Sequence, residues 1–284
     1  MPTFATTGPV TVSLAIASGD VRVVAGARDE AVAEIRPRNA ASADDATLAE
    51  NSRVDFSGDT LSISVPKPPT SWRNFIGFDY PAVDIVVEVP EGSRLRGKVS
   101  AGDLTSDGRL GEVRLEAGYG GVRLDATGSL HLNCSYGDVV VNSTSGHSDI
   151  TTASGTVRVA TIDGTAVVRN SNGDITLGEV SGDLRVKQAN GDIVVDRTRA
   201  TVVAKSAYGD VVLREIVSGD VVLETSSGDI EIGIPRGTAA WIDSHTDFGS
   251  MHNSLTTNDG PAENTEKANV RARTAYGDIR LTRS

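Results

Sequence analysis

The chain has few of the residues on which catalytic and metal sites are usually built. Among 284 residues there are one cysteine, Cys134, and four histidines. A single cysteine excludes an internal disulfide and fits a reducing compartment. The histidines lack the spacing of zinc ligands or of a catalytic triad. No glycine is followed by the Lys-Ser/Thr pair of a phosphate-binding loop. We therefore predict no catalytic residue, no metal centre of these kinds and no enzymatic activity.

Long apolar runs and an excess of basic residues are also lacking. No uninterrupted apolar run approaches the ~20 residues needed to cross a bilayer. The first 20 residues, MPTFATTGPVTVSLAIASGD, carry no basic residue ahead of their apolar part, unlike a secretory signal. The net charge of -11 opposes binding to nucleic acid or to an anionic membrane. We expect a cytoplasmic protein without a nucleic-acid partner and without direct membrane insertion.

Aromatic residues are scarce, since 2 Trp, 5 Tyr and 5 Phe stand against 30 glycines. This ratio argues against an ordinary packed globule. Helix formers dominate no long window, whereas Val, Ile, Leu and Thr recur in short runs that end at Gly, Asp, Asn or Ser. The sequence therefore predicts an all-β protein.

Glycine recurs through the middle of the chain at intervals of 9 residues with single-residue slips. Alternate glycines resemble each other more than neighbouring ones do, because one class often follows Tyr or Asn and the other does not. The repeating unit is therefore about 18 residues long and has two similar halves. The glycines of the first class are Gly102, Gly120, Gly137, Gly155, Gly173, Gly191, Gly209 and Gly228.

Each half repeat predicts one short strand, because the second and fourth residues after the glycine are usually apolar. Two strands and two corners, repeated without hairpin returns, predict one coil of a single-stranded parallel β-solenoid, a β-helix with irregular caps at both ends. Residues 97–234 would form about seven coils. Residues 1–96 would supply N-terminal strands and a cap with an aromatic loop at 68–81. Residues 235–284 would form a C-terminal capping segment, whose last strand returns to cover the sheet edge.

Three features together resemble a known bacterial family. They are the strands that follow Gly-Asp, the preceding DIVVEVPEGSRL segment at 84–95, and the DIEIGIP exit at 229–235. They resemble the bacterial β-strand-repeat family labelled putative adhesin, a family of undefined function. The resemblance covers most of the chain and implies the fold. The family label also implies the cell surface as an alternative location, and it implies no catalytic residues.

An aspartate follows many of the first-class glycines, and four of these aspartates fall on consecutive predicted coils. Carboxylates ~4.8 Å apart repel each other by about 1 kcal/mol per pair even in water, so something must offset the repulsion. One interpretation is that each Asp accepts backbone N–H groups at its own corner. The other is a calcium-binding row, as in Gly/Asp nonapeptide rolls, although this chain has one glycine per half repeat. The four residues are Asp174, Asp192, Asp210 and Asp229.

The predicted aromatic loop is the first candidate binding site. The segment PPTSWRNFIGFDYP at 68–81 concentrates aromatic residues around one arginine and is bounded by prolines. These rings could plug the open end of the solenoid. They could also bind a protein partner or mediate self-association, since Trp, Tyr and Arg dominate interface energetics. The candidate residues are Trp72, Arg73, Phe75, Phe78 and Tyr80.

A second candidate is the corner that carries Tyr119, Tyr136 and Tyr208, with Asn172 and Asn190 at the same position of other coils. These side chains could line a ligand groove or could be present for turn geometry. Cys134 falls where other coils carry small polar residues, so we expect it to be a small inward or corner residue rather than a nucleophile.

The leading functional hypothesis is a non-enzymatic scaffold or protein-interaction module with an unknown protein partner. One alternative is self-assembly into filaments, as in the bactofilins, which share only the architecture. Another is a carbohydrate-active β-helix enzyme of the pectate-lyase type. No cofactor is expected other than the calcium of the second interpretation.

Overall fold

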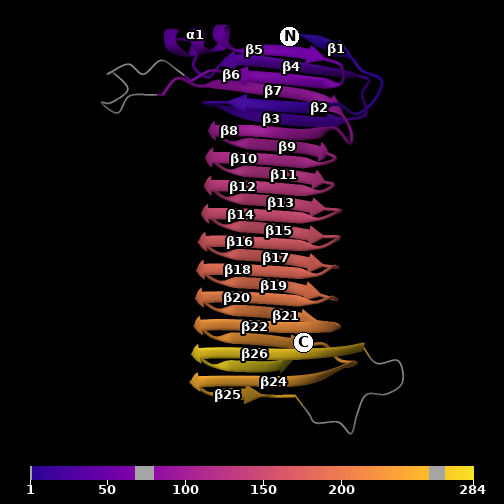
Figure 1. The fold of residues 1–284 in the computed structure, drawn as a ribbon, viewed down its shortest axis with the longest axis vertical. Coiled ribbons are helices and arrows are strands. Elements are labelled where there is room, and N and C mark those ends of the chain that lie inside the picture. Colours follow the sequence, from indigo (N-terminus) through magenta and orange to yellow (C-terminus); the bar gives the residue numbers. More distant parts are fainter. Residues whose placement is uncertain (1, 68–79, 256–265) are drawn as a thin grey trace. The chain divides into compact units, whose positions relative to one another are not determined.

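The computed structural model describes residues 2–67, 80–255 and 266–284. The chain forms two compact units, Met1–Val140 and Val141–Ser284. Each unit consists of short, mostly parallel strands that belong to two sheets (Figure 1). The predicted all-β, parallel-dominated fold is confirmed. The predicted boundaries at 96/97 and 234/235 remain predictions.

Consecutive strands of the first unit alternate between the two sheets. One sheet has the order β1-β4-β7-β3-β9-β11-β13, and the other has the order β5-β6-β2-β8-β10-β12. The strand β13 contains the boundary between the units. The strands are β1 (Thr3–Ala5), β2 (Thr11–Ile16), β3 (Gly19–Gly26), β4 (Glu30–Pro37), β5 (Arg53–Ser57), β6 (Thr60–Val65), β7 (Val83–Pro90), β8 (Arg94–Ala101), β9 (Leu104–Arg109), β10 (Val113–Tyr119), β11 (Val122–Thr127), β12 (Leu130–Tyr136) and β13 (Val139–Thr144).

The second unit continues the same alternation. One sheet has the order β15-β17-β19-β21-β23-β27-β25, and the other has the order β14-β16-β18-β20-β22-β26-β24. The strands are β14 (Ser148–Ser154), β15 (Val157–Ile162), β16 (Ala166–Asn172), β17 (Ile175–Val180), β18 (Leu184–Asn190), β19 (Ile193–Thr198), β20 (Val202–Tyr208), β21 (Val211–Ile216), β22 (Gly219–Ser227), β23 (Ile230–Ile234), β24 (Thr238–Phe248), β25 (Met251–Asn253), β26 (Glu266–Tyr276) and β27 (Ile279–Arg283).

The core lies between the two sheets and follows the predicted alternation. In β18, Leu184 and Val186 are buried, and they lie beside Ala166 and Val168 of β16. The apolar second and fourth positions after the glycines are buried in both units, as the period of two predicts. Each such Val, Leu or Ile contributes about 1.5–3 kcal/mol when it leaves water. Because like positions stack in register, every coil depends on its neighbours for burial.

The first-class glycines form a column at one corner of each unit. Gly209 has φ +130°, and a Cβ built on it would lie 2.0 Å from the carbonyl oxygen of Gly191. Gly120 repeats this geometry in the first unit, with φ +131° and a Cβ position 2.2 Å from the carbonyl oxygen of Gly102. Any side chain there would be both strained and overlapping. Glycine is therefore required because successive corners lie in contact.

A column of small buried side chains lies inside the same corner. Asn170 donates from Nδ2 to the carbonyl oxygens of Gly155, at 2.9 Å, and Gly173, at 2.8 Å. Thr225 donates to the carbonyl of Gly209 at 3.1 Å. These bonds satisfy carbonyl groups that the tight corner takes away from water.

Cys134 occupies the equivalent inner corner position in the first unit, as predicted, and is fully buried. Its Sγ faces the carbonyl oxygens of Gly120, at 3.9 Å, and Gly137, at 3.7 Å. Burial raises the pKa of the Cys134 thiol, and the negative charge of Asp138 raises it further, while a hydrogen bond from the Tyr136 backbone opposes both. The thiolate is therefore disfavoured, which suits a packing residue.

The first unit ends in antiparallel strands and a helix. β1 pairs antiparallel with β4, β4 with β7, and β5 with β6. The rings of Phe4 and Phe56 stack at 4.9 Å and connect the two outermost strands. The helix α1 (Ala43–Asn51) packs against β4 through Leu48. Ser42 caps the start of the helix, because its Oγ accepts a hydrogen bond from the Asp45 N–H at 3.2 Å.

The second unit ends differently. The last strands β26 and β27 lie within the sheets and do not form the edge. β26 pairs in parallel with β22 on one side and with β24 on the other (Figure 1). The coil made by β24 and β25 is consequently the outermost one of the described residues. The expectation that the C-terminal strand covers the edge is therefore wrong, because an earlier segment has already taken the outer position.

Candidate functional site

A row of aspartates runs along the glycine corner of the second unit. Asp174 accepts the backbone N–H of Asp192 at 3.0 Å, and Asp192 accepts that of Asp210 at 2.8 Å. The pattern continues from Asp210 to Asp229 at 2.7 Å and from Asp229 to Asp278 at 2.8 Å. Each carboxylate thus uses Oδ1 to fix the next coil, not its own corner as one interpretation supposed. These bonds offset the repulsion between neighbouring carboxylates.

The second carboxylate oxygen of these residues remains on the surface, because Asp174, Asp192, Asp210 and Asp229 are exposed. The ion pairs described in this unit use other carboxylates, among them Asp196, Glu215 and Glu224. In the described part of the chain, no group of three or more His, Cys, Asp or Glu side chains is arranged to hold a metal ion. Calcium binding by the four aspartates stays a prediction.

Flat side chains stack two residues before the aspartates, at the end of one sheet. In the second unit, Asn172 lies beside Asn190, and Asn190 lies beside Tyr208. The Asn190 Nδ2 donates to the Asn172 Oδ1 at 3.0 Å. Further along, Tyr276 stacks on Phe248 with ring centroids 4.9 Å apart and planes 8° from parallel. The column reads Ser154, Asn172, Asn190, Tyr208, Ser227, Tyr276, Phe248.

The first unit repeats this arrangement on a shorter scale. Tyr119 and Tyr136 stack with centroids 5.0 Å apart and planes 4° from parallel. Both rings are more than half exposed. An exposed parallel stack gains contact between the rings but leaves the outer faces available to another molecule.

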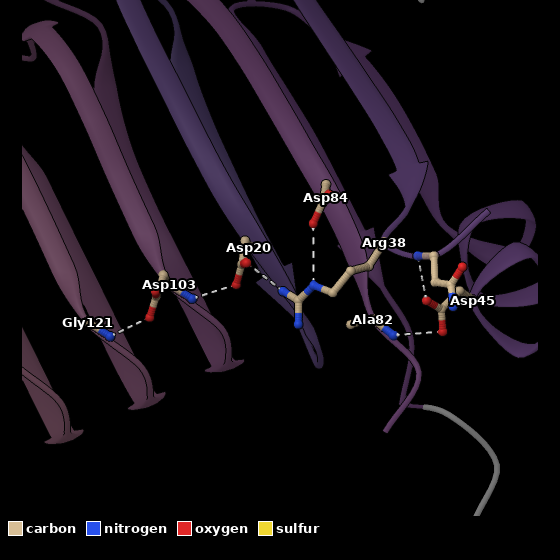
Figure 2. A network of polar contacts seen from close by, with 8 residues as sticks. Asp20, Arg38, Asp45, Ala82, Asp84, Asp103 and Gly121 are labelled. Carbon is tan, nitrogen blue, oxygen red and sulfur yellow. Dashed lines mark hydrogen bonds and ion pairs between the residues drawn. The ribbon is translucent and has the colours of Figure 1, made fainter. Parts of the chain in front are cut away.

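The aspartate row of the first unit begins beside an arginine. Figure 2 shows Arg38 between Asp20, at 2.6 Å, and Asp84, at 3.5 Å. Asp20 accepts the N–H of Asp103 at 2.9 Å, and Asp103 accepts the N–H of Gly121 at 2.7 Å. The row therefore starts from a guanidinium that partly neutralises it.

The helix α1 is tied to the same network through Asp45 (Figure 2). The buried Asp45 carboxylate accepts the N–H of Asn39 at 2.9 Å and that of Ala82 at 3.4 Å. Beside Arg38, a shallow groove of about 380 Å³ is lined by Arg22 together with four aspartates: Asp20, Asp84, Asp103 and Asp107. Arg22 is paired with Asp107 at 2.9 Å. We interpret this network as the link between the helix and the end strands, because Arg38 bridges Asp20 and Asp84 and Asp45 binds the backbone on both sides of it.

The predicted aromatic loop lies mostly outside the described residues. Trp72, Arg73, Phe75 and Phe78 lie outside the described residues. Tyr80 is described, and its side chain is 54% exposed. The choice between a cap and a binding loop therefore stays open. At the end of the first unit the rings of Phe4 and Phe56 stack on each other. The sequence analysis did not single out these two residues.

Two other residues of the aromatic column were missed, although signals for them exist. Tyr276 stands in Tyr-Gly-Asp, the same triplet that marks Tyr136 and Tyr208. Phe248 stands in Phe-Gly-Ser, a weaker version of that triplet. The spacing of the repeats did not reveal these two residues, because the last coils follow one another in a different order in the sheet than in the chain.

These observations define the class of protein: a parallel β-solenoid with a repetitive exposed corner. A family model described as Toastrack DUF4097 matches residues 10–215 and 178–282. The chain belongs to this family, which confirms the family resemblance seen in the sequence. No match was found among curated proteins.

Several solved structures are similar to this chain at low identity. A putative adhesin from Parabacteroides merdae is 10% identical over 100% of this chain and 95% of the other, with TM-score 0.39. A putative lipid binding protein from Parabacteroides distasonis is 12% identical over 100% and 95%, with TM-score 0.37. A putative cell adhesion protein from Clostridium sporogenes is 8% identical over 100% and 98%, with TM-score 0.24. At these scores the likenesses carry no functional argument.

Proposed function

We propose that the protein is a non-enzymatic binding module whose contact surface is the corner strip of the second unit. This corner strip consists of the rings of Tyr208, Tyr276 and Phe248 and the carboxylates of Asp210, Asp229 and Asp278. One observation carries the proposal. Eight large apolar or aromatic side chains are strongly exposed in the described residues, and five of them lie in the corner columns: Tyr119, Tyr136, Tyr208, Phe248 and Tyr276.

The chemistry of the corner strip favours a cationic partner. Its aromatic faces attract guanidinium and ammonium groups. The carboxylate row adds a local negative field that the ion pairs of this unit leave unneutralised, in a chain of net charge -11. Corners that repeat every ~4.8 Å would suit an extended segment that presents Lys or Arg at several successive positions. A basic protein segment is therefore the proposed partner class.

The loop around Trp72, Arg73, Phe75, Phe78 and Tyr80 is retained as a second possible contact surface. Of these residues Tyr80 is exposed, which supports an interaction role for its end of the loop. The two candidate contact surfaces can be distinguished, because the residues of the loop and those of the corner strip can be substituted separately.

The partner class can be tested by fluorescence anisotropy with labelled peptides of equal length. One peptide is rich in Arg and Lys, one in Asp and Glu, and one is neutral and aromatic. We expect saturable binding of the basic peptide that weakens as salt is added, because exposed charges are screened. Equal binding of all three peptides, or binding of the neutral peptide alone, would contradict a cationic partner.

For location we propose the cytoplasm, with the cell surface as the alternative. The proposal is supported by the single cysteine, which is free and buried. No helix in the described residues is long and apolar enough to cross a membrane. An antibody against the chain would decide between the two locations. Labelling of intact cells would place the protein at the surface, and detection only in the soluble fraction of broken cells would place it in the cytoplasm.

A further inference from the structure

The strand β24 leaves one side unpaired within the described residues. It is 11 residues long, pairs in parallel with β26, and stands last in its sheet. Exposed edge strands pair readily with other chains unless Pro, Lys or inward-pointing charges protect them. The sequence of β24, TAAWIDSHTDF, contains neither Pro nor Lys. Its inward positions, Ile242, Ser244 and Thr246, are uncharged, as their register with Val270, Ala272 and Thr274 indicates.

We propose that β24 pairs with β24 of a second copy of this chain, antiparallel and symmetric about Ser244. A two-fold axis through Ser244 keeps the inward residues of both strands facing the core, because opposed residues in an antiparallel pair share a face. Residues 240–248 then lie opposite residues 248–240 of the partner. This would extend the sheet across two chains by main-chain hydrogen bonds.

This register sets no like charges opposite each other. On the outer face, Asp243 lies opposite His245 of the partner subunit, and the symmetry produces this pair twice. Trp241 lies opposite the partner's Asp247, a carboxylate that can accept the indole N–H. At present the Trp241 side chain is 63% exposed. On the inner face, Ile242 lies opposite the partner's Thr246. Such cross-strand pairs stabilise antiparallel strands.

Neighbouring registers place like charges together. An axis through Asp243 would pair all 11 residues of the strand, but it sets Asp243 opposite the partner's Asp243. An axis through His245 sets Asp243 opposite the partner's Asp247 twice. Within one chain, Asp243 lies 3.4 Å from Arg271 and His245 lies 3.1 Å from Asp247, so the pairs across the axis would join groups that already have ionic neighbours. Like charges directly opposite each other destabilise strand pairs, and the axis through Ser244 avoids them.

The test uses disulfide trapping in the full chain, because the symmetry axis predicts which cysteine meets itself. Ser244→Cys places two sulfurs at the axis, where Cα atoms of opposed residues lie ~4.5–5.5 Å apart, within disulfide range. Ala240→Cys is the matched control on the same strand and face. In this register it lies eight residues from its own copy, ~27 Å away. The native Cys134 is buried and gives a common background.

The expected result is a concentration-dependent dimer by sedimentation velocity, trapped by oxidation in Ser244→Cys and not in Ala240→Cys. His245→Asp, which sets two aspartates opposite each other, should weaken the dimer at least tenfold. The swap Asp243→His with His245→Asp should restore it, while His131→Asp on β12 should leave it unchanged. A chain that stays monomeric at all concentrations, or that is trapped equally through both cysteines, would overturn the proposal.

Discussion

The two compact units build the same glycine corner but treat its charge and their ends differently. In the first unit the aspartate row meets Arg38, and antiparallel strands with α1 close the sheets. In the second unit the row runs from Asp174 to Asp278 outside the described ion pairs, and the outermost coil is parallel. The difference teaches which features build the fold and which are available for binding. Features common to both units stabilise coils, and the second unit adds a longer row of aspartates that lies outside the described ion pairs.

The largest expected effect tests the shared corner. Gly120→Ala in the first unit and Gly209→Ala in the second should each lower the free energy of unfolding by roughly 2–5 kcal/mol, from positive-φ strain and backbone overlap. Urea denaturation measures the effect. The control is Gly121→Ala, whose Cβ would approach the Asp138 carbonyl no closer than 3.5 Å. If Gly120→Ala and Gly121→Ala cost the same, the stacked-corner explanation fails.

The next effect concerns the end that the first unit closes. Asp45→Ala should cost about 2–3 kcal/mol, because it removes a helix-capping partner and leaves the buried Ala82 N–H without an acceptor. Asp44→Ala is the matched control, since Asp44 is exposed in the same first turn. Hydrogen exchange should show faster exchange of the Ala82 and Asn39 amides in Asp45→Ala alone. Equal stability of both variants would show that the network does not fasten the end.

A smaller effect separates the hydrogen bond of the aspartate row from its charge. Asp192→Ala should cost about 1 kcal/mol and speed exchange of the Asp210 amide, whereas Asp192→Asn, which keeps an oxygen acceptor, should stay within about 0.5 kcal/mol. Asp103→Ala repeats the test in the first unit through the Gly121 amide. Slow exchange of the Asp210 amide in Asp192→Ala would contradict the hydrogen-bonded row.

The same variants decide the calcium hypothesis. A row that binds calcium must raise the melting temperature when millimolar calcium is added, by mass action. Asp192→Asn should then lose part of that rise. No difference between calcium and EDTA in the native chain would remove calcium from consideration.

The smallest expected effect contrasts Cys134 of the first unit with the polar residues at the equivalent inner positions of the second unit. Because the pKa of the folded thiol is raised above 9.0, its contribution to stability is fully present below about pH 9. It is lost as pH rises through the folded pKa. Cys134→Thr, which has the side chain found at Thr225, should remove this pH dependence. Denaturation between pH 8 and 10.5 measures it, and identical curves for both proteins would contradict the assigned cause.

The repeating part of the fold could be predicted because its signals are local. Val157, Ile175 and Ile193 are buried at the second position after a glycine, as a period of two requires. The ends could not be predicted in the same way. The coil order β22-β26-β24 depends on which segment reaches the edge first, and no spacing in the sequence encodes that competition.

The candidate site was predictable to a different degree. The aspartates and tyrosines of the corner follow from the triplet Tyr-Gly-Asp, so their presence on one corner was predicted. Their bonding was not, because an Asp that serves its own turn and one that serves the next coil have the same sequence pattern. The exposed face of Trp241 depends on β24 being outermost, which the sequence did not reveal.

The central claim is that the corner strip of the second unit is the contact surface. Its most direct test is titration of the basic peptide into the native chain, into Tyr208→Ser/Tyr276→Ser and into Tyr80→Ser. Serine occupies the same column at Ser154 and Ser227, so the double variant should fold. We predict about tenfold weaker binding for the double variant, from two lost cation–ring contacts, and unchanged binding for Tyr80→Ser. Unchanged affinity in the double variant, with loss in Tyr80→Ser, would contradict the claim and move the site to the aromatic loop.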